Sequence, residues 1–310
     1  MVKNIKNDEE KKKNKRTALE AYLMRIMVWK KILENPGISQ TEIMKKLKQI
    51  ECPFLNIPQS TLSNIIKELE DNEIIIVVTD KGVKPKRYAA TYYGALLFLS
   101  DFPLMKFLVD ELKNRLDEDE NCIKNIYKET DYKFILHIIE NATRGFIEYA
   151  DQGTFLKIFL KKEELEEYRK NLENIYGRDI FEIMVRLSLY YWWIYGQNVY
   201  GSEKDTLLNY AAILFYPSVI FTFIISDAFM RYGYELTEPL FLPKQRKVIY
   251  RKKEIDFKKL IKQTLQNTNL LSKQEINTIL DVFEKYDVIV QGNKLLKNKL
   301  LEPPLEFNFQ

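Results

Sequence analysis

Residues 60–75, with the sequence STLSNIIKELEDNEII, decide the fold of the N-terminal part of the chain. Apolar side chains recur in this stretch at helical spacing, at Leu62, Ile65, Ile66 and Leu69. Their period predicts a helix that opens near Ser60, just after Pro58. After Asn72 the period changes to a β-rich run over residues 74–79, which predicts a strand.

The residues before this stretch predict two more helices. An apolar-striped helix spans residues 18–34 and stops at Pro36-Gly37. The next helix opens at Ser39, because Ser39-Gln-Thr-Glu42 has the pattern of a capping box. In this motif the serine side chain accepts a hydrogen bond from the helix, and the glutamate reaches back to the cap.

The residues after the strand predict a β-hairpin with a basic tip. A turn at Asp80-Lys81-Gly82 leads to a basic run and then to a return strand around residues 88–91. The basic residues are Lys84, Lys86 and Arg87. Three helices followed by such a hairpin predict a winged helix-turn-helix, so the fold class expected for the whole chain is mainly α with a small β-wing.

The order of these elements resembles the winged helix-turn-helix transcription regulators of the broad MarR, PadR and ArsR type, in their archaeal form. Residues 60–75 and the later run KRYAATYYG over residues 86–94 carry the resemblance, which covers about residues 18–99. It implies a recognition helix followed by a hydrophobic strand and a basic wing. The chain departs from the simplest pattern by inserting residues 49–57 before the third helix.

A DNA-binding role for this module predicts two sets of contact residues. The third helix would enter the major groove, where its polar side chains meet base edges: Gln59, Ser60, Thr61, Ser63 and Asn64. Basic residues of the helix and the wing would meet phosphates or the adjacent minor groove: Lys67, Lys81, Lys84, Lys86 and Arg87.

The charge distribution favours a nucleic-acid partner for the N-terminal part. Residues 1–100 hold 18 Lys and Arg against 12 Asp and Glu, whereas residues 101–310 hold 30 against 32. Basic side chains bind a phosphate backbone through the release of its counterions. Residues 1–17 are charged and lack the apolar core of a signal peptide. They predict a basic, disordered tail.

The sequence offers no pattern typical of an enzyme, a metal site or a cofactor site. Cys52 and Cys122 are too few and too isolated to predict a disulfide framework, which indicates a reduced, cytoplasmic protein. His137 is the single histidine, and its apolar neighbours predict a packing or helix-surface role. We also find no glycine-rich phosphate loop, no Cys-x-x-Cys and no nucleophile elbow.

Residues 103–310 predict a helical domain for dimerisation or sensing. Helices are expected over residues 103–116, 131–149 and 161–176, and another follows Asp179. Aromatic residues are frequent in the later helices, so the interior of this domain could accept an apolar small molecule or a second copy of the chain.

The charge-free run Thr206–Ser226 permits a second interpretation of this domain. Its 21 residues are long enough to cross a bilayer, and residues 187–199 could form a companion span. Against this, Asn209 and Pro217 interrupt the run, and Arg186 lies at the edge of the companion. A buried helical core is the preferred prediction, with a membrane hairpin as the alternative.

The end of the chain partly echoes the first module. A second capping box, Ser272-Lys-Gln-Glu275, precedes a predicted helix over residues 276–286. A β-rich run at residues 288–291 and a Gly292-Asn293 turn then predict a hairpin. Residues 256–301 therefore suggest either a second winged-helix-like subdomain or a generic helix followed by a hairpin.

These observations lead to the hypothesis of a cytoplasmic, homodimeric transcription regulator that binds specific sequences of double-stranded DNA. Three alternatives remain from the sequence. One is a plasmid or viral replication initiator built from winged helices. The others are a protein-docking winged helix and a membrane-anchored regulator.

Overall fold

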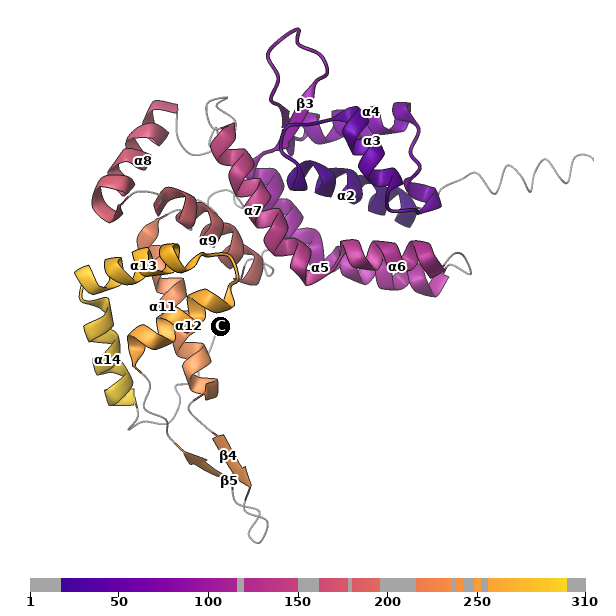
Figure 1. Ribbon diagram of the computed structural model, residues 1–310. Coiled ribbons are helices and arrows are strands. Elements are labelled where there is room, and N and C mark those ends of the chain that lie inside the picture. The colour runs from indigo at the N-terminus through magenta and orange to yellow at the C-terminus, as the bar shows by residue number, and fades with distance from the viewer. Residues whose placement is uncertain are drawn as a thin grey trace, which may run out of the picture. The chain divides into compact units, whose positions relative to one another are not determined.

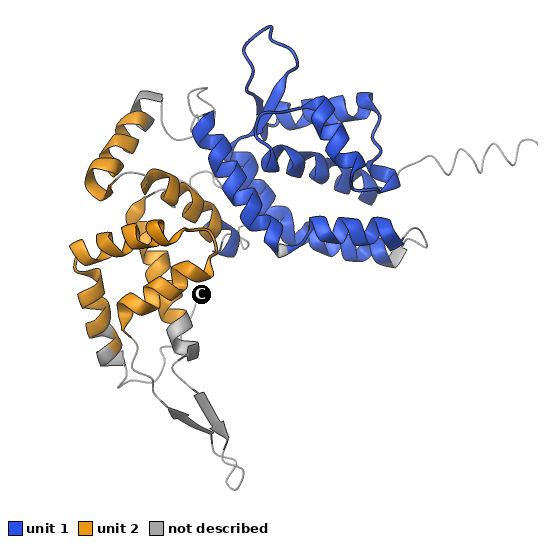
Figure 2. Ribbon diagram, in the orientation of Figure 1, with its two compact units in different colours: residues 1–165, 192–211 blue, residues 166–191, 212–310 orange. Residues whose placement is uncertain are grey.

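The structure is a computed structural model that describes most of the chain as helices. Its described residues are 18–115, 120–149, 162–177, 180–195, 216–235, 238–241, 248–251 and 256–299. Within them the protein forms twelve α-helices and a small three-stranded antiparallel sheet (Figure 1). The prediction of a mainly α fold is thereby confirmed. The chain divides into two compact units, residues 1–165 with 192–211 and residues 166–191 with 212–310 (Figure 2).

The first unit begins with three α-helices and a short 3-10 turn. They are α2 (Ala18–Glu34), α3 (Gln40–Lys48), η1 (Pro53–Leu55) and α4 (Gln59–Asp71). All three α-helices were predicted, and α4 begins one residue before Ser60 with Pro58 as its N-cap. The capping box of α3 is confirmed, because the side chain of Ser39 accepts from the backbone N–H of Glu42 and the carboxylate of Glu42 accepts from the backbone N–H of Ser39.

The three-stranded sheet joins the start and the end of this module. Its strands are β1 (Ile38–Ser39), β2 (Ile75–Val77) and β3 (Arg87–Ala90). Strand β3 lies in the middle, with Ile38 opposite Tyr88 on one side and Ile75 opposite Ala90 on the other. The hairpin β2–β3 was predicted, whereas the two-residue strand β1 was too short to leave a period in the sequence.

The core of the module forms between α2 and the elements that cover it. Most residues of α2 from Leu23 onward are buried, and the ring of Trp29 meets the ring of Phe98 edge to face at 5.3 Å. The inserted residues 49–57 add to this core, since Leu55 and Ile57 are buried. The insertion is therefore packed against the module.

Three further helices complete the described part of the first unit. They are α5 (Tyr92–Arg115), α6 (Glu120–Glu129) and α7 (Tyr132–Glu148), and α7 is capped by Asp131. Helix α5 continues through Pro103, so the boundary drawn between residues 102 and 103 falls inside one helix. A Cβ on Gly145 of α7 would lie 2.6 Å from the side chain of Pro36, which shows how closely α7 packs on the turn after α2.

Among the described helices, α5 is the one that is long and apolar enough to cross a membrane. The qualifying stretch is Tyr92–Lys113, and half of its most apolar window is buried inside the protein. Within the first unit, Trp192 near the end of α9 (Ile180–Tyr195) contacts α5, because its Nε1 donates to the carbonyl oxygen of Leu96 at 3.1 Å. The core helix of a globular protein has the same length and composition as such a stretch.

The second unit is built from the remaining helices and a two-stranded sheet. Besides residues 180–191 of α9 these are α8 (Lys162–Tyr176), α11 (Pro217–Glu235), α12 (Phe257–Asn267), α13 (Lys273–Lys285) and α14 (Val288–Lys299), with strands β4 (Glu238–Phe241) and β5 (Val248–Arg251). The predicted α8 and the capping box of α13 are confirmed. Strands β4 and β5 pair antiparallel and were not predicted.

A largely covered arginine, Arg186, holds α9 to α13. Arg186 forms an ion pair with Glu275, and its Nη1 donates to the carbonyl oxygen of Leu270 at 2.9 Å. Glu275 is also the N3 residue of the capping box of α13 and accepts from the backbone N–H of Ser272, so one carboxylate serves both contacts. Burial raises the pKa of Glu275, but hydrogen bonds from Arg186 and Ser272 outweigh that effect and lower it.

The prediction of a hairpin near the end of the chain is wrong. Residues 288–299 form the helix α14, so neither the second winged-helix-like subdomain nor the generic hairpin is present there. Gly292 and Asn293 do not form a turn. Both lie in α14 and contact Phe257 of α12. A Cβ on Gly292 would lie 2.1 Å from the ring of Phe257, and Asn293 Oδ1 accepts from the backbone N–H of Phe257 at 2.9 Å.

The charge-free run Thr206–Ser226 is only partly described. Residues 206–215 lie outside the described residues, and Pro217 begins α11 instead of interrupting a helix. A stripe of α11 at Ile220, Ile224 and Ala228 is buried. For residues 206–215, the buried core thus stays a prediction, with the membrane hairpin as its alternative.

Candidate nucleic-acid interface

One face of α4 carries polar side chains that point away from the core. Gln59, Ser60, Ser63, Asn64 and Lys67 are exposed, at positions that return to the same side of the helix after each turn. The opposite face is buried through the apolar residues that predicted the helix. The exposed face therefore presents hydrogen-bonding groups and one positive charge on a helix that its core contacts hold in place.

Two of the five predicted base-reading residues are less available than the others. The hydroxyl of Ser63 donates to the carbonyl oxygen of Gln59 at 2.9 Å and accepts from Nε2 of Gln40 at 2.6 Å. Thr61 is half-buried. Gln59, Ser60 and Asn64 are thus the side chains of α4 with most freedom to meet a ligand.

Gln40 is a residue that the sequence reasoning missed. It is the first residue of α3, and its side-chain amide reaches Ser63 of α4. It therefore fixes the start of one helix against the exposed face of the other. The sequence held no signal for it, because a glutamine just after a cap is equally common on a free surface.

The β2–β3 loop carries the predicted lysines. Figure 1 shows this loop projecting away from the helices of the module. Lys81, Lys84 and Lys86 are exposed, and none forms an ion pair with another described residue. Their positive charges are accordingly open to an anionic partner.

Arg87 differs from these lysines because it is held by the module itself. Its Nη1 donates to the carbonyl oxygen of Gly37 at 2.8 Å, and the same atom lies 3.6 Å from a carboxylate oxygen of Glu42. The arginine thus ties the base of the hairpin to the turn between α2 and α3. Its predicted role as a phosphate contact competes with this anchoring.

The charge of Glu42 is stabilised by the capping box. Hydrogen bonds from the side chain and the backbone N–H of Ser39 lower the pKa of Glu42, and the nearby positive charges of Arg87 and Lys46 lower it further. The carboxylate therefore stays ionised at neutral pH. It neutralises part of the positive charge at the hairpin base, which leaves the loop lysines as the main basic surface.

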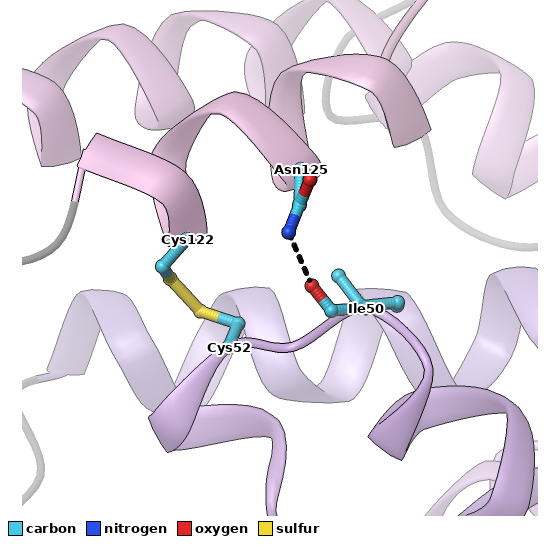
Figure 3. The surroundings of a disulfide bond; sticks show 4 residues. All are labelled: Ile50, Cys52, Cys122 and Asn125. Carbon is cyan, nitrogen blue, oxygen red and sulfur yellow. Dashed lines mark hydrogen bonds between the residues drawn. A yellow bond between two sulfur atoms is a disulfide. The ribbon is translucent and has the colours of Figure 1, made fainter.

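The insertion before α4 is fastened to α6 by a disulfide bond. Cys52 and Cys122 are joined across 70 positions of sequence, with their Cα atoms 4.5 Å apart (Figure 3). The expectation that these cysteines form no disulfide is wrong. They lie far apart in sequence, and the packing of α6 against the insertion, which brings them together, has no signature in the sequence.

A hydrogen bond lies beside the disulfide. Nδ2 of Asn125 donates to the carbonyl oxygen of Ile50 at 3.0 Å (Figure 3). Cys122 and Asn125 are three positions apart on α6, so they share one side of the helix. The insertion is therefore held to α6 on both sides of Glu51.

Farther along α6, a cluster of charged side chains joins this helix to α2. Nζ of Lys30 lies 2.6 Å from Oε2 of Glu129 and 2.5 Å from Oε1 of Glu34. Nζ of Lys31 lies 2.7 Å from the same oxygen of Glu129. Lys30 is fully buried and also lies over the ring of Phe134, 4.3 Å from its centre.

The ionisation of Glu129 follows from its position in this cluster. Burial raises the pKa of Glu129, but the charge of Lys30 and hydrogen bonds from Lys30 and Lys31 outweigh burial and lower it. A buried lysine needs such a partner, because an unpaired charge in the interior is strongly unfavourable. The cluster is a structural link between α2 and α6.

His137 lies on the exposed side of α7, where the amide of Asn141 contacts its ring. This placement agrees with the helix-surface alternative of its predicted role. Among the described residues, no group of three or more histidine, cysteine or acidic side chains is placed to hold a metal ion. Comparisons with protein-family models, curated proteins and solved structures give no match to this chain.

Proposed function

We propose that the protein is a transcription regulator whose N-terminal module is a winged helix that binds specific sequences of double-stranded DNA. Helix α4 enters the major groove, and the β2–β3 loop acts as the wing on phosphates or the adjacent minor groove. The observation that carries the proposal is the exposed polar face of α4 in the same module as a projecting loop with three unpaired lysines.

The chemistry of α4 supports the major groove as its partner. The amides of Gln59 and Asn64 both donate and accept, and the hydroxyl of Ser60 does the same. Glutamine and asparagine pair with adenine through two hydrogen bonds, and serine contacts several bases. Pro58 supplies no side-chain cap, so the first N–H groups of α4 stay available to a phosphate.

The charges of α4 also support an orientation on DNA. Lys67 lies on the exposed polar face, whereas Glu68 is paired with Arg25 of α2. Asp71 is exposed at the C-terminal end of the helix. The N-terminal half of α4 is therefore the part that approaches a polyanion most favourably.

A salt titration of full-length protein on a labelled duplex tests the proposal. If about four to six phosphates are contacted, the logarithm of affinity falls against the logarithm of salt concentration with a slope of about −3.6 to −5.4. Absence of binding at low salt, or a flat response to salt, contradicts DNA binding. A protein-docking winged helix would then be the better interpretation.

A charge-matched pair of variants locates the contact. The double variant Lys84→Ser/Lys86→Ser removes two charges from the loop, and Lys124→Ser/Lys128→Ser removes two exposed charges from α6. The loop variant should flatten the slope by about 2, since each lost phosphate contact lowers it by about 1. The α6 variant should keep the slope, and an equal effect of both would show that only the net charge matters.

The proposal extends to a cytoplasmic homodimer. A two-fold regulator matches two half-sites about one helical turn of DNA apart. We assign dimerisation, and the binding of an apolar small molecule, to the helices after α7. Light scattering and cell fractionation of the full chain test this part independently of DNA binding.

A further inference from the structure

The disulfide between the two cysteines of the chain lies close in sequence to the start of α4. Cys52 belongs to the insertion and lies six positions before Pro58, the N-cap of α4. Cys122 lies on α6, and the disulfide joins them. Both residues are buried, at 5% and 3% exposure. The covalent link therefore ends close to the point where α4 begins.

The segment between the disulfide and α4 is short and well packed. It consists of the turn η1 and a few residues, of which Leu55 and Ile57 are buried. A constraint on Cys52 is consequently passed to Gln59 and Ser60, the first polar residues of α4. These are among the side chains with most freedom to meet bases.

Helix α6 does not depend on the disulfide alone. Glu129 is bound to Lys30 and Lys31, and Asn125 donates to the carbonyl oxygen of Ile50, through contacts that do not involve the sulfurs. Ile123 and Ile126 of α6 are also buried. Reduction would thus free one end of the attachment while the other end stays in place, which makes a local change more favourable than unfolding.

We propose that Cys52–Cys122 is a redox-responsive clamp that tightens DNA binding when it is closed. The inference rests on the proposed function, because it regulates that same α4. In reducing compartments disulfides are rare, and those that form are mostly transient and catalytic or redox-sensing. A buried pair next to a DNA-contacting helix fits the sensing role.

The chemistry of opening is thiol–disulfide exchange. The thiolate of a dithiol reductant attacks one sulfur of the disulfide, forms a mixed disulfide and releases the other cysteine as a thiolate. The second thiol of the reductant then displaces the first cysteine. Two electrons and two protons pass to Cys52 and Cys122, and the reductant leaves as a cyclic disulfide.

The experiment compares oxidised and dithiothreitol-reduced full-length protein on the same labelled duplex. Alkylation of free thiols with iodoacetamide, followed by mass spectrometry, establishes the state of the cysteines in each sample. Because both sulfurs are buried, the reduction is followed over time until the thiol count is complete. We expect reduced protein to bind about five- to tenfold more weakly, at the lower end of the usual range for coupled sites.

Hydrogen exchange supplies a readout that does not need DNA. Amides of residues 49–61 should exchange faster in the reduced protein, whereas those of α2 should not change, since α2 keeps its core contacts. Equal exchange and equal affinity in both states overturn the clamp. Free thiols in protein purified under air without reductant also overturn it.

Variants separate the clamp from other effects of the reductant. Cys52→Ala/Cys122→Ala should bind DNA like the reduced protein and be insensitive to dithiothreitol. A similar loss on addition of dithiothreitol to this variant overturns the clamp. If neither state binds duplex DNA but exchange at residues 49–61 still differs, the proposed function fails while the mechanical effect of the disulfide on α4 is supported.

Discussion

The guanidinium of Arg87 donates a hydrogen bond to the carbonyl oxygen of Gly37, which joins the base of the hairpin to the turn between α2 and α3. Gly37 has a φ of +79°, and a Cβ there would lie 2.2 Å from the hydroxyl of Tyr149, the residue that follows α7. The hairpin base, the turn and the end of α7 thus meet at one point. A residue predicted to bind DNA is therefore also part of the contacts that hold the base of the β2–β3 hairpin.

Replacing Arg87 by alanine should therefore reduce stability as well as DNA binding. We expect a loss of about 1 kcal/mol in the free energy of unfolding, because the lost hydrogen bond is charge-assisted but partly exposed to water. Lys84→Ala is the matched control, with a stability change within about 0.5 kcal/mol. Urea unfolding measures both, and an unchanged stability in Arg87→Ala would contradict the anchoring role.

Substitutions on α4 should change sequence preference more than affinity. Ser60→Ala and Asn64→Ala should each weaken binding to a cognate site, selected from a random duplex library, by about 1 to 3 kcal/mol per lost good base contact. Binding to random DNA should change little, whereas Lys84→Ala should weaken both equally. Equal losses on cognate and random DNA in the α4 variants would show that this helix does not read bases.

Glu129→Gln should destabilise the protein, since it removes the partner that Lys30 and Lys31 share. We expect about 3 kcal/mol, at the lower end for a broken buried pair, because Lys30 keeps Glu34. Glu140→Gln, on the exposed side of α7, is the control and should change stability by less than about 0.5 kcal/mol. The midpoints of urea unfolding at pH 7 give the comparison.

The same variant should change the response to acid. The pKa of Glu129 is lower in the folded protein than its ordinary value of 4.5, so its ionised form stabilises the fold above that pH. This contribution is lost as the pH falls below 4.5 and through the folded pKa. Between pH 5 and 3 the wild type should therefore lose more stability than Glu129→Gln, and parallel curves for the two proteins would contradict this.

Gly292→Ala tests the helical assignment at the end of the chain. Alanine favours a helix over glycine by about 1 kcal/mol, but its Cβ would overlap the ring of Phe257, which should cost about 1 to 3 kcal/mol. We expect a lower Tm. Gln291→Ala, an exposed neighbour on α14, should leave Tm nearly unchanged, and a rise in Tm for Gly292→Ala would mean that this contact is absent.

The full-length protein should be a dimer without detergent. Light scattering should give a mass about twice the 37.0 kDa of one chain. A monomer would remove the proposed match to two half-sites. Recovery of the protein only with the membrane fraction would favour the membrane-anchored alternative.

Local patterns predicted the first module well. The capping box at Ser39 and the periodic apolar residues of α4 act within a few residues, so one sequence is enough to locate those helices. The exposed lysines of the β2–β3 loop could be predicted for the same reason, because the turn and strand patterns on either side of them are also local. What sequence could not give was the tertiary partner of each residue, such as Gly37 for Arg87 or Gln40 for Ser63.

The errors arose where a tertiary contact outweighed a local preference. The β-branched residues before Gly292 favour a strand, but in the structure the segment is a helix in which that glycine packs closely on Phe257 of α12. The disulfide was missed for a related reason, because Cys52 and Cys122 meet only through the docking of α6. The continuity of α5 through Pro103 was hidden by a residue that more often ends helices.

The disulfide also encloses α4, the hairpin and α5 in a covalent ring, because these elements all lie between Cys52 and Cys122. The peptide bonds after the exposed loop residues Lys81 and Lys86 are accessible to a protease that cleaves after lysine. A single cut after either of them would open the ring without releasing a fragment, since the disulfide still joins the two pieces. Cleavage of the hairpin would then leave the size of the chain on a denaturing gel unchanged until a reductant separates the two pieces.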